Sequence, residues 1–412
     1  MRAPLTPGRP AELLELGAIE DPHPIFSRVR EASALSRVGE TGVHMVATWE
    51  SVLEVLGRET DFSANLTGVL VRDADGEPSV FDLPPVDGAR VIATADEPRH
   101  GVHRRILKPG MSASRFAKLE PAIRGWAREI IADWLGSGGG DFAPISEILP
   151  CRVIGHLLGL PEDDLDQHRA WAMMGGEILA GDVSPSKLQG LAAATAPMAR
   201  YLGRHLAAAA QGAEPSPGDS LMSRLAAGVD SGEISASEAT GIAIVMFGAG
   251  GESTTSLIGS AVRLLAENPE LADQLRADPA RVPRFVEEAV RLEPPFKFHY
   301  RAVRRECELE GYALVPGDRL MLLWASANRD PAIFSAPDEI DLNRKHPKHH
   351  LSFGRGAHFC LGEQIARLET RVMIEEILAS TGRISLDPDH PPVHARSIFV
   401  RRLEKLPIII DS

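Results

Sequence analysis

The chain has 412 residues, of which 44% are hydrophobic and 25% are charged, a composition that is ordinary for a globular protein. Its 57 acidic residues outnumber its 44 lysines and arginines, and the formal net charge of −13 argues against nucleic acid or an anionic membrane surface as a partner. A chain of this length buries enough surface to enclose a bulky ligand without disulfide bonds.

The start of the chain and its cysteines indicate where the protein resides. Residues 1–20 contain no apolar run of the length that a signal peptide or a membrane span requires, so we expect a flexible N-terminal segment, no membrane anchor and no export. The three cysteines, Cys151, Cys307 and Cys360, are an odd and sparse set that does not suggest disulfide bonds. We therefore expect a reducing, cytoplasmic location, with Cys151 packed in a helix and Cys307 in a hairpin.

The first segment with a chemical signal is residues 94–107, TADEPRHGVHRRIL, which we predict to be helical. His100 and Arg104 are one helical turn apart, so both side chains can reach the same anion. Farther along the chain, apolar residues at helical spacing predict helices over 187–210, 235–265, 261–277 and 281–292.

Between the helices, the glycine- and proline-rich stretches at 136–140 and 212–218 predict loops rather than domain linkers, because amphipathic patterns resume on both sides. We find no internal repeat and no GxGxxG or Walker pattern. Strand signals cluster at 301–324 and near 396–409. We therefore expect one domain over residues 1–412, mainly α with minor β hairpins.

The helix predicted over 235–265 has two unusual features. It starts with a capping box, in which Ser235 and Glu238 satisfy each other's backbone N–H groups. Its interior holds two adjacent glycines, Gly250 and Gly251, and each costs roughly 1 kcal/mol relative to alanine in a helix interior. The glycines therefore need a structural or functional reason.

Residues 351–364 read Leu-Ser-Phe-Gly-Arg-Gly-Ala-His-Phe-Cys-Leu-Gly-Glu-Gln and lead into a helix predicted over 361–379. A thiolate just before a helix suits a strongly donating axial ligand of heme iron, because N–H groups at the helix start can donate to the sulfur. The alternative for any lone cysteine is a buried structural residue. Residues Phe353 to Gly362 have the spacing F-G-x-G-x-H-x-C-x-G.

This segment resembles the cysteine signature of the cytochrome P-450 superfamily, as found in its soluble bacterial-type members. The resemblance runs from about residue 20 to the C-terminus and includes EPP at 293–295 and ANRDP at 327–331. It implies the cytochrome P-450 fold, with heme b held between the 235–265 helix and the cysteine loop. It also implies that Cys360 is the axial thiolate and the metal ligand.

The resemblance assigns further residues to the heme. His100, Arg104, Arg301 and His358 fall where the family binds the heme propionates, although each of them alone would suit a surface position as well. The residues that the resemblance implies in heme binding are His100, Arg104, Ala249, Arg301, Phe353, His358, Cys360 and Gly362.

The family also has a buried glutamate–arginine pair that secures the segment around the cysteine loop. Glu288 and Arg291 match this pair, and their i, i+3 spacing on the helix predicted over 281–292 permits an ion pair. Arg344 is the candidate for a third partner, although the aromatic residue that usually precedes it is Ile340 here.

Within the long helix, FGAGGESTTSLIG resembles the family pattern A-G-x-[DE]-T. The resemblance implies that Glu252 relays protons and that Ser253 hydrogen-bonds bound oxygen, with Thr254 next in line. The family usually has threonine at the Ser253 position, and serine lacks the methyl group that stiffens χ1, so we expect looser proton delivery and more peroxide release. Gly250 and Gly251 would leave room for dioxygen and a kink; the alternative is a seam of small residues packed between helices.

The implied activity is that of a heme-thiolate monooxygenase, which inserts one oxygen atom from dioxygen into a hydrophobic small molecule. The chain has no fused flavin or nicotinamide domain and no cysteine set for an iron–sulfur cluster, so we expect electrons from NAD(P)H to arrive through a separate ferredoxin and ferredoxin reductase. Arg104, Arg105 and Arg355 are candidates for receiving the ferredoxin. A peroxide-using peroxygenase, a non-catalytic heme sensor and a heme-free helical scaffold remain alternatives.

Four segments resemble the pocket-lining parts of the family: 63–94, 170–200, 296–300 and 398–399. Their leucine, valine, phenylalanine and methionine side chains indicate an apolar pocket. The polar stretch at 71–88 is a candidate for a mobile lid.

Overall fold

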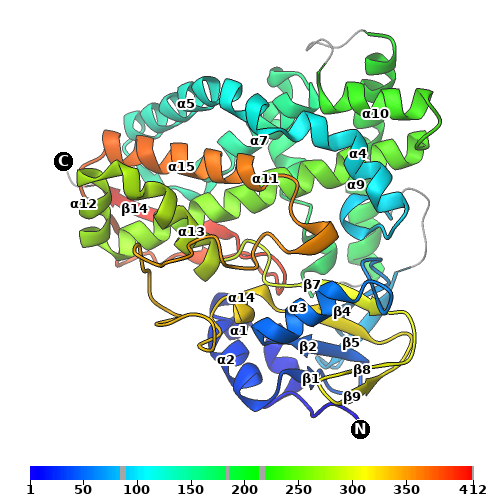
Figure 1. Ribbon diagram of the computed structural model, residues 1–412. Helices are drawn as coiled ribbons and strands as arrows, with labels where there is room; N and C mark the ends of the chain where they lie inside the picture. The colour runs from blue at the N-terminus through cyan, green and yellow to red at the C-terminus, as the bar shows by residue number, and fades with distance from the viewer. Residues whose placement is uncertain (84–89, 182–184, 213–218, 411–412) are drawn as a thin grey trace.

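Helices make up most of the structure, a computed structural model that describes residues 1–83, 90–181, 185–212 and 219–410. Figure 1 shows the long helices gathered in one larger part, and the main sheet with the N-terminal helices in a smaller part at the other end. The prediction of a mainly α fold with minor β hairpins is confirmed. The helices are α1 (Leu16–Glu20), α2 (His23–Ala32), α3 (Trp49–Gly57), α4 (Arg99–Leu107), α5 (Ala113–Gly136), α6 (Ala143–Ser146), α7 (Ile148–Leu158), α8 (Leu165–Ala172), α9 (Pro185–Ala210), α10 (Leu221–Asp230), α11 (Ala236–Glu267), α12 (Pro269–Ala277), α13 (Val282–Leu292), α14 (Trp324–Ala327) and α15 (Glu363–Ser380).

The strands are short and lie in several small sheets. Within the described residues, the main sheet has the order β1-β2-β10-β7-β3, in which β10 pairs in parallel with β2 and antiparallel with β7. The strands are β1 (Leu35–Arg37), β2 (Val43–Val46), β3 (Phe62–Ser63), β4 (Gly68–Arg72), β5 (Pro78–Asp82), β6 (Gly140–Asp141), β7 (His299–Val303), β8 (Cys307–Leu309), β9 (Tyr312–Leu314), β10 (Arg319–Leu322), β11 (Ile384–Leu386), β12 (Val393–His394), β13 (Leu403–Lys405) and β14 (Pro407–Ile410). The register places Arg301 of β7 opposite Leu320 of β10.

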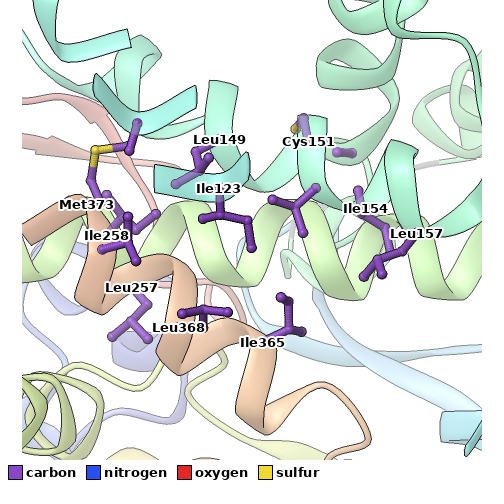
Figure 2. Close-up of a cluster of buried hydrophobic side chains, with 14 of the residues drawn as sticks. Ile123, Leu149, Cys151, Ile154, Leu157, Leu257, Ile258, Ile365, Leu368 and Met373 are labelled. Atoms are coloured by element: carbon purple, nitrogen blue, oxygen red, sulfur yellow. The ribbon is translucent and has the colours of Figure 1, made fainter. Parts of the chain in front are cut away.

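Helix α11 forms the centre of the larger part. Its predicted capping box is present, since the side chains of Ser235 and Glu238 bond each other's backbone N–H groups. Figure 2 shows Leu257 and Ile258 of this helix among side chains of the neighbouring helices, namely Ile123 of α5, Leu149 and Ile154 of α7, and Leu368 and Met373 of α15. Among the described helices, α11 is long and apolar enough to cross a membrane, but 67% of its most apolar window is buried inside the protein, as expected of a core helix.

The glutamate–arginine pair predicted from the sequence is buried at the end of α13. Arg291 donates from Nε and Nη2 to the carboxylate of Glu288 at 2.9 and 2.8 Å. Arg344 donates to the same carboxylate at 2.9 Å, which confirms it as the third partner. Both guanidinium groups lie over the ring of Phe334, at 5.3 and 5.6 Å from its centroid. Phe334 therefore supplies an aromatic contact even though position 340 is an isoleucine.

Several local predictions need correction or completion. Residues 1–20 were expected to be flexible, but Leu13, Leu14 and Ile19 are buried because a 3-10 helix, η1 (Pro10–Leu14), and α1 pack on the apolar side of the sheet. Residues 71–82 of the candidate lid at 71–88 belong to the β4–β5 hairpin, and its residues 84–88 lie outside the described residues, so the lid stays a prediction.

The two other cysteines lie where the sequence predicts them. Cys151 is buried in α7, and Cys307 lies in β8 of the β8–β9 hairpin. The loop predicted at 212–218 falls almost entirely outside the described residues.

Candidate active site

The cysteine loop is shaped by two glycines in left-handed backbone conformations. Gly354 has φ 69° and Gly356 has φ 71°, a region that other residues enter only with strain. The backbone N–H of Cys360 donates to the carbonyl of Phe353 at 2.9 Å, which closes the loop. Helix α15 then starts at Glu363 with Gly362 as its N-cap residue, two residues later than predicted. The sulfur of Cys360 therefore lies next to the N–H groups of a helix start.

The environment of the Cys360 thiol suits a metal-bound thiolate. Burial raises the pKa of the thiol, whereas the Gly362 N–H and the charges of Arg367 and Arg104 act in the opposite direction. A thiol must lose its proton to bind a metal. A metal cation bound to the sulfur would therefore stabilise the negatively charged thiolate that burial disfavours. The Arg367 guanidinium lies 4.3 Å from the ring centroid of Phe353, which holds that ring in the loop.

A cationic cluster lies beside the cysteine loop. The imidazoles of His100 in α4 and His358 in the 3-10 helix η7 (Gly356–His358) are stacked, with 3.9 Å between their centroids. Arg301 reaches the same region from β7, and Arg104 donates to the carbonyl of Phe359 at 2.8 Å. The structure therefore brings together four residues that are up to 258 positions apart in the sequence, His100 being the first and His358 the last.

The cluster has donors that the protein leaves unused. Arg301 is buried and donates to the carbonyl of Tyr300 at 2.8 Å, but no carboxylate in the described part of the chain accepts a hydrogen bond from it. Burial lowers the pKa of Arg301 to about 10, and burial together with the charge of Arg301 lowers the pKa of His358 to about 3. A buried guanidinium without an anion is a cradle for carboxylates, so these residues fit the propionates of a heme.

The middle of α11 presents different residues to different neighbours. Ala249 is exposed and Ser253 is half-buried, although the residues on either side of this turn are buried, so this face of the helix is accessible, and the space in front of it is here called the hollow. The Ser253 hydroxyl donates to the carbonyl of Ala249. Thr254 is buried and shares its face with Gly250, which lies against Ile154 of α7. The structure thus brings Ser253 but not Thr254 to the face of Ala249.

The two glycines of α11 are explained by packing, which corrects the reason expected from the sequence. A Cβ added to Gly251 would lie 2.6 Å from Cβ of Ala172, and one added to Gly250 would lie 3.1 Å from Ile154. Both glycines therefore allow close approach of neighbouring segments rather than room for dioxygen. Gly250 and Gly251 are therefore part of a seam of small residues between packed segments, which was the alternative explanation.

Replacing Gly251 by alanine tests this seam. We expect Gly251→Ala to lower the free energy of unfolding by about 1–3 kcal/mol, because the new methyl group must separate α11 from Ala172. The matched control is Gly259→Ala in the same helix, where the nearest atoms to the new Cβ lie at 3.7 Å. The control should gain up to about 1 kcal/mol from helix propensity. Equal unfolding midpoints in urea for the two variants would contradict the packing explanation.

Glu252 lies on a third face of α11 and is buried. Its Oε2 accepts the backbone N–H of Gly176 at 2.9 Å, and its Oε1 lies 3.5 Å from Nε of Arg402. Burial raises the pKa of Glu252 to about 7, against the opposing charge of Arg402. A carboxyl group with a pKa near the working pH can both take up and release a proton.

Sequence reasoning assigned no individual role to His299. Nε1 of Trp324 donates to Nδ1 of His299 at 2.7 Å, so the proton of the neutral ring is on Nε2. Burial lowers the pKa of His299 to about 3, which keeps the ring neutral. His299 and Arg301 are two residues apart in β7 and thus share a face of the sheet. The hydrogen bond between Trp324 and His299 depends on a contact between β7 and α14, and no pattern in the sequence indicates this contact.

A cysteine at a helix start, a cationic cluster beside it and an acidic residue on the central helix define the class of heme-thiolate proteins. The comparisons with known proteins agree. A family model described as Cytochrome P450 matches residues 213–392. Over 403 residues, the chain is 36% identical to "Cytochrome P450 144" of Mycobacterium tuberculosis, an alignment that covers 96% of this chain and 90% of the relative. It is 33% identical over 362 residues to "Erythromycin C-12 hydroxylase" of Saccharopolyspora erythraea, covering 86% and 88%.

Solved structures share the fold. A mutant of P450 EryK in complex with erythromycin B superposes with a TM-score of 0.82 at 30% identity, covering 96% of this chain and 98% of that one. CYP108D1 from Novosphingobium aromaticivorans gives a TM-score of 0.85 at 26% identity, covering 99% of both chains. The chain belongs to the cytochrome P450 family, and it is a cytochrome P450 monooxygenase that uses heme with a cysteine thiolate ligand. The predicted family and fold are confirmed.

Proposed function

We propose that Cys360 is the axial thiolate of heme b and that the enzyme inserts one oxygen atom from dioxygen into a hydrophobic small molecule. The observation that carries the proposal is the position of the Cys360 thiol at a helix start, beside a cationic cluster whose buried Arg301 donates no hydrogen bond to a carboxylate in the described residues. Heme held by a thiolate supplies the activation of dioxygen when it is bound.

The protein's own residues would hold that heme at two places. The N–H of Gly362 donates to the sulfur of Cys360, and Phe353 packs against Arg367 next to it and helps to exclude water. At the other place, His100, Arg104, Arg301 and His358 would donate to the two propionates, in the cluster described above. Ala249, on the accessible face of α11, would also contact the heme.

The substrate is proposed to be an apolar small molecule bound in the hollow bordered by α11. Phe296 and Phe399 stack with 4.6 Å between their centroids, and His299 contacts both rings. Their apolar surface supports a hydrophobic ligand. Among the structural neighbours, P450 EryK was solved with erythromycin B and CYP109E1 of Bacillus megaterium with testosterone, which are both large organic molecules.

Isotope labelling tests the activity. Compounds are first screened with the purified holoenzyme for a shift of the heme spin state, and the best binder is then turned over with NADPH, a [2Fe–2S] ferredoxin and a ferredoxin reductase under ¹⁸O₂. We expect the product to carry one ¹⁸O atom. Turnover with hydrogen peroxide that exceeds NADPH-driven turnover would instead indicate a peroxygenase, and a binder without any turnover would indicate a heme sensor.

Proton delivery is proposed to use Glu252 and Ser253. Glu252 holds an exchangeable proton near neutral pH, and the Ser253 hydroxyl lies on the face of α11 that borders the hollow. Thr254 was a further candidate, but its side chain faces α7, so it would contribute only after a rearrangement of the helix.

We expect Ser253→Thr to raise the product formed per NADPH consumed, because the added methyl group restricts χ1 and holds the hydroxyl in one orientation. Product and hydrogen peroxide are measured together for the wild type and the variant. Thr254→Ser is the matched control, since it makes the reverse change on the buried face of the helix. An unchanged ratio in Ser253→Thr would count against looser proton delivery in the wild type.

Electrons are proposed to come from NAD(P)H through a separate ferredoxin and its reductase in the cytoplasm, with the whole chain acting as one domain. Arg105 and Arg355 are exposed near the cysteine loop, and Arg104 contacts that loop directly. We expect Arg105→Glu and Arg355→Glu to slow reduction by an acidic [2Fe–2S] ferredoxin and to leave reduction by dithionite unchanged, because charge complementarity raises association rates. Equal losses with both reductants would reject this docking surface.

A further inference from the structure

The carboxylate of Glu252 is held by two segments that are remote from it in the sequence. One is the loop of residues 173–176, which joins α8 to the 3-10 helix η5 (Glu177–Leu179) and donates the Gly176 N–H to Oε2 at 2.9 Å. The other is the segment before β13, from which Nε of Arg402 lies 3.5 Å from Oε1. Both carboxylate oxygens of Glu252 therefore have a partner.

The loop of residues 173–176 fits closely between these segments. A Cβ on Gly175 would lie 3.0 Å from Cα of Gly248 in α11, and a Cβ on Gly176 would lie 2.4 Å from Cγ2 of Val400. A Cβ on Gly176 would also lie 3.1 Å from Oε2 of Glu252. Larger residues at these two positions would push the loop away from α11, so the glycines are required for the loop to reach Glu252.

The C-terminal segment is attached to α11 next to the same carboxylate. Ser256, one helical turn after Glu252, donates to the carbonyl of Arg401 at 2.5 Å. The side chain of Arg401 is engaged elsewhere, since its Nε donates to Glu293 at 2.8 Å. Arg402 is mostly buried. Its Nε makes no hydrogen bond with the described residues, so the 3.5 Å contact with Glu252 is an ion pair in which the positive charge of Arg402 acts on the carboxylate.

We infer that Arg402 and the backbone N–H of Gly176 are positioning groups that hold Glu252 and determine how readily it gives up its proton. The anchoring itself follows from the contacts above. Its consequence for turnover rests on the proposed role of Glu252 in proton delivery.

The charges around Glu252 give the direction of this control. Arg402 and the Gly176 N–H stabilise the carboxylate, whereas burial and the negative charge of Glu177 favour the protonated acid. The thiol of Cys151 in α7 also lies near, but burial keeps it protonated and uncharged. Arg402 and the Gly176 N–H therefore both favour release of the proton of Glu252.

The geometry adds a second element of control. With both oxygens engaged, the Glu252 carboxylate lies on the face of α11 toward Gly176, whereas Ser253 lies on the face that borders the hollow. Neighbouring residues of a helix are rotated by about 100° from each other. The proton must therefore travel from the face of Glu252 to that of Ser253.

The experiment measures the protonation of Glu252 directly. The C=O stretch of its protonated carboxyl is followed by infrared difference spectroscopy of the holoenzyme across pH, and the band is assigned by its loss in Glu252→Gln. We expect the titration midpoint to rise in Arg402→Gln by at least one pH unit, within the roughly 1–3 units that an adjacent opposite charge imposes. Arg402→Lys, which keeps the charge, should restore most of the wild-type midpoint.

Glu177→Gln is the matched control with the opposite sign. Removal of its negative charge should lower the midpoint of Glu252, while the variant keeps Arg402 and the loop glycines in place. Folding of each variant is checked by the amplitude of its ferrous–carbon monoxide spectrum. An unchanged midpoint in a folded Arg402→Gln variant would overturn the inference.

A second readout separates this inference from the proposed function. The ratio of product to NADPH is measured across the same pH range in the wild type and Arg402→Gln. If the midpoint of the ratio moves with the infrared midpoint, the loop and Arg402 act on proton supply. If the infrared midpoint moves and the ratio does not, the anchoring of Glu252 stands and its proposed role in proton delivery fails.

Discussion

Replacing Cys360 by histidine is expected to abolish the red-shifted Soret band of the ferrous–carbon monoxide form and to reduce monooxygenase turnover by more than the roughly 100-fold that loss of a supporting residue costs at a metal site. The thiolate pushes electron density toward the iron and favours cleavage of the O–O bond, which an imidazole does less well. The loop geometry at Cys360 supports this expectation, because its sulfur faces the N–H of Gly362 at the start of α15.

The matched control is Cys307→Ser. Cys307 is also a free, partly accessible cysteine, but it lies in the β8–β9 hairpin, away from the cysteine loop. The control should keep the red-shifted band at full amplitude. Both variants are compared after reduction with dithionite, so that redox partners play no part. A red-shifted band in Cys360→His, or its loss in Cys307→Ser, would show that Cys360 is not the thiolate ligand.

Replacing Arg291 by leucine is expected to lower the free energy of unfolding by about 3–5 kcal/mol, because it leaves the buried carboxylate of Glu288 with one partner fewer. Arg291 is completely buried and also donates to the carbonyls of Asn328, Pro337 and Glu339, at 3.1, 2.6 and 2.8 Å. These bonds hold the chain that leads to the cysteine loop. We therefore expect Arg291→Leu to incorporate less heme as well.

The matched control is Arg9→Met, which removes an exposed arginine whose ion pair with Glu15 lies on the surface. Its effect should stay below about 1 kcal/mol, since water screens exposed pairs. Urea unfolding of both variants, followed by tryptophan fluorescence, measures the difference. A loss in Arg291→Leu as small as that in Arg9→Met would mean that the buried pair does not secure this segment.

The pH dependence of the buried pair has a defined sign. Burial raises the pKa of Glu288, but the hydrogen bonds from Arg291 and Arg344 outweigh it, so the pKa is lowered from its usual value. The stability that the pair contributes is therefore present above the ordinary pKa of a glutamate and is lost as the pH falls through the lowered value. The difference between wild type and Arg291→Leu should shrink under acidic conditions.

Candidate heme-binding residues could be proposed from the sequence where they belong to contiguous patterns. The cysteine loop, the pair of His100 and Arg104 one turn apart, and the spacing of Glu288 and Arg291 are all visible within short windows of sequence. Local rules of helix and turn geometry then place each group. Only the exact start of α15, at Glu363, had to come from the structure.

The surroundings of Glu252 could not be predicted in this way. Its partners, Gly176 and Arg402, are 76 and 150 positions away along the chain, and neither stands out in the sequence as a polar ligand. The tautomer of His299 depends on Trp324 in the same manner. The two glycines of α11 are visible in the sequence. The close packing of Ala172 and Ile154 against them, which explains why they are glycines, is not indicated by any local pattern.

By itself, the sequence of this protein determined its family and its helical class and supplied candidates for heme binding, because those depend on short-range spacing and on the chemistry of single side chains. The tertiary structure alone decided which face of α11 each residue occupies and which segments hold the Glu252 carboxylate. The physical reason is that burial, ion pairing and close backbone contact join segments distant in the chain. Their effect on a proton depends on the distances that only folding sets.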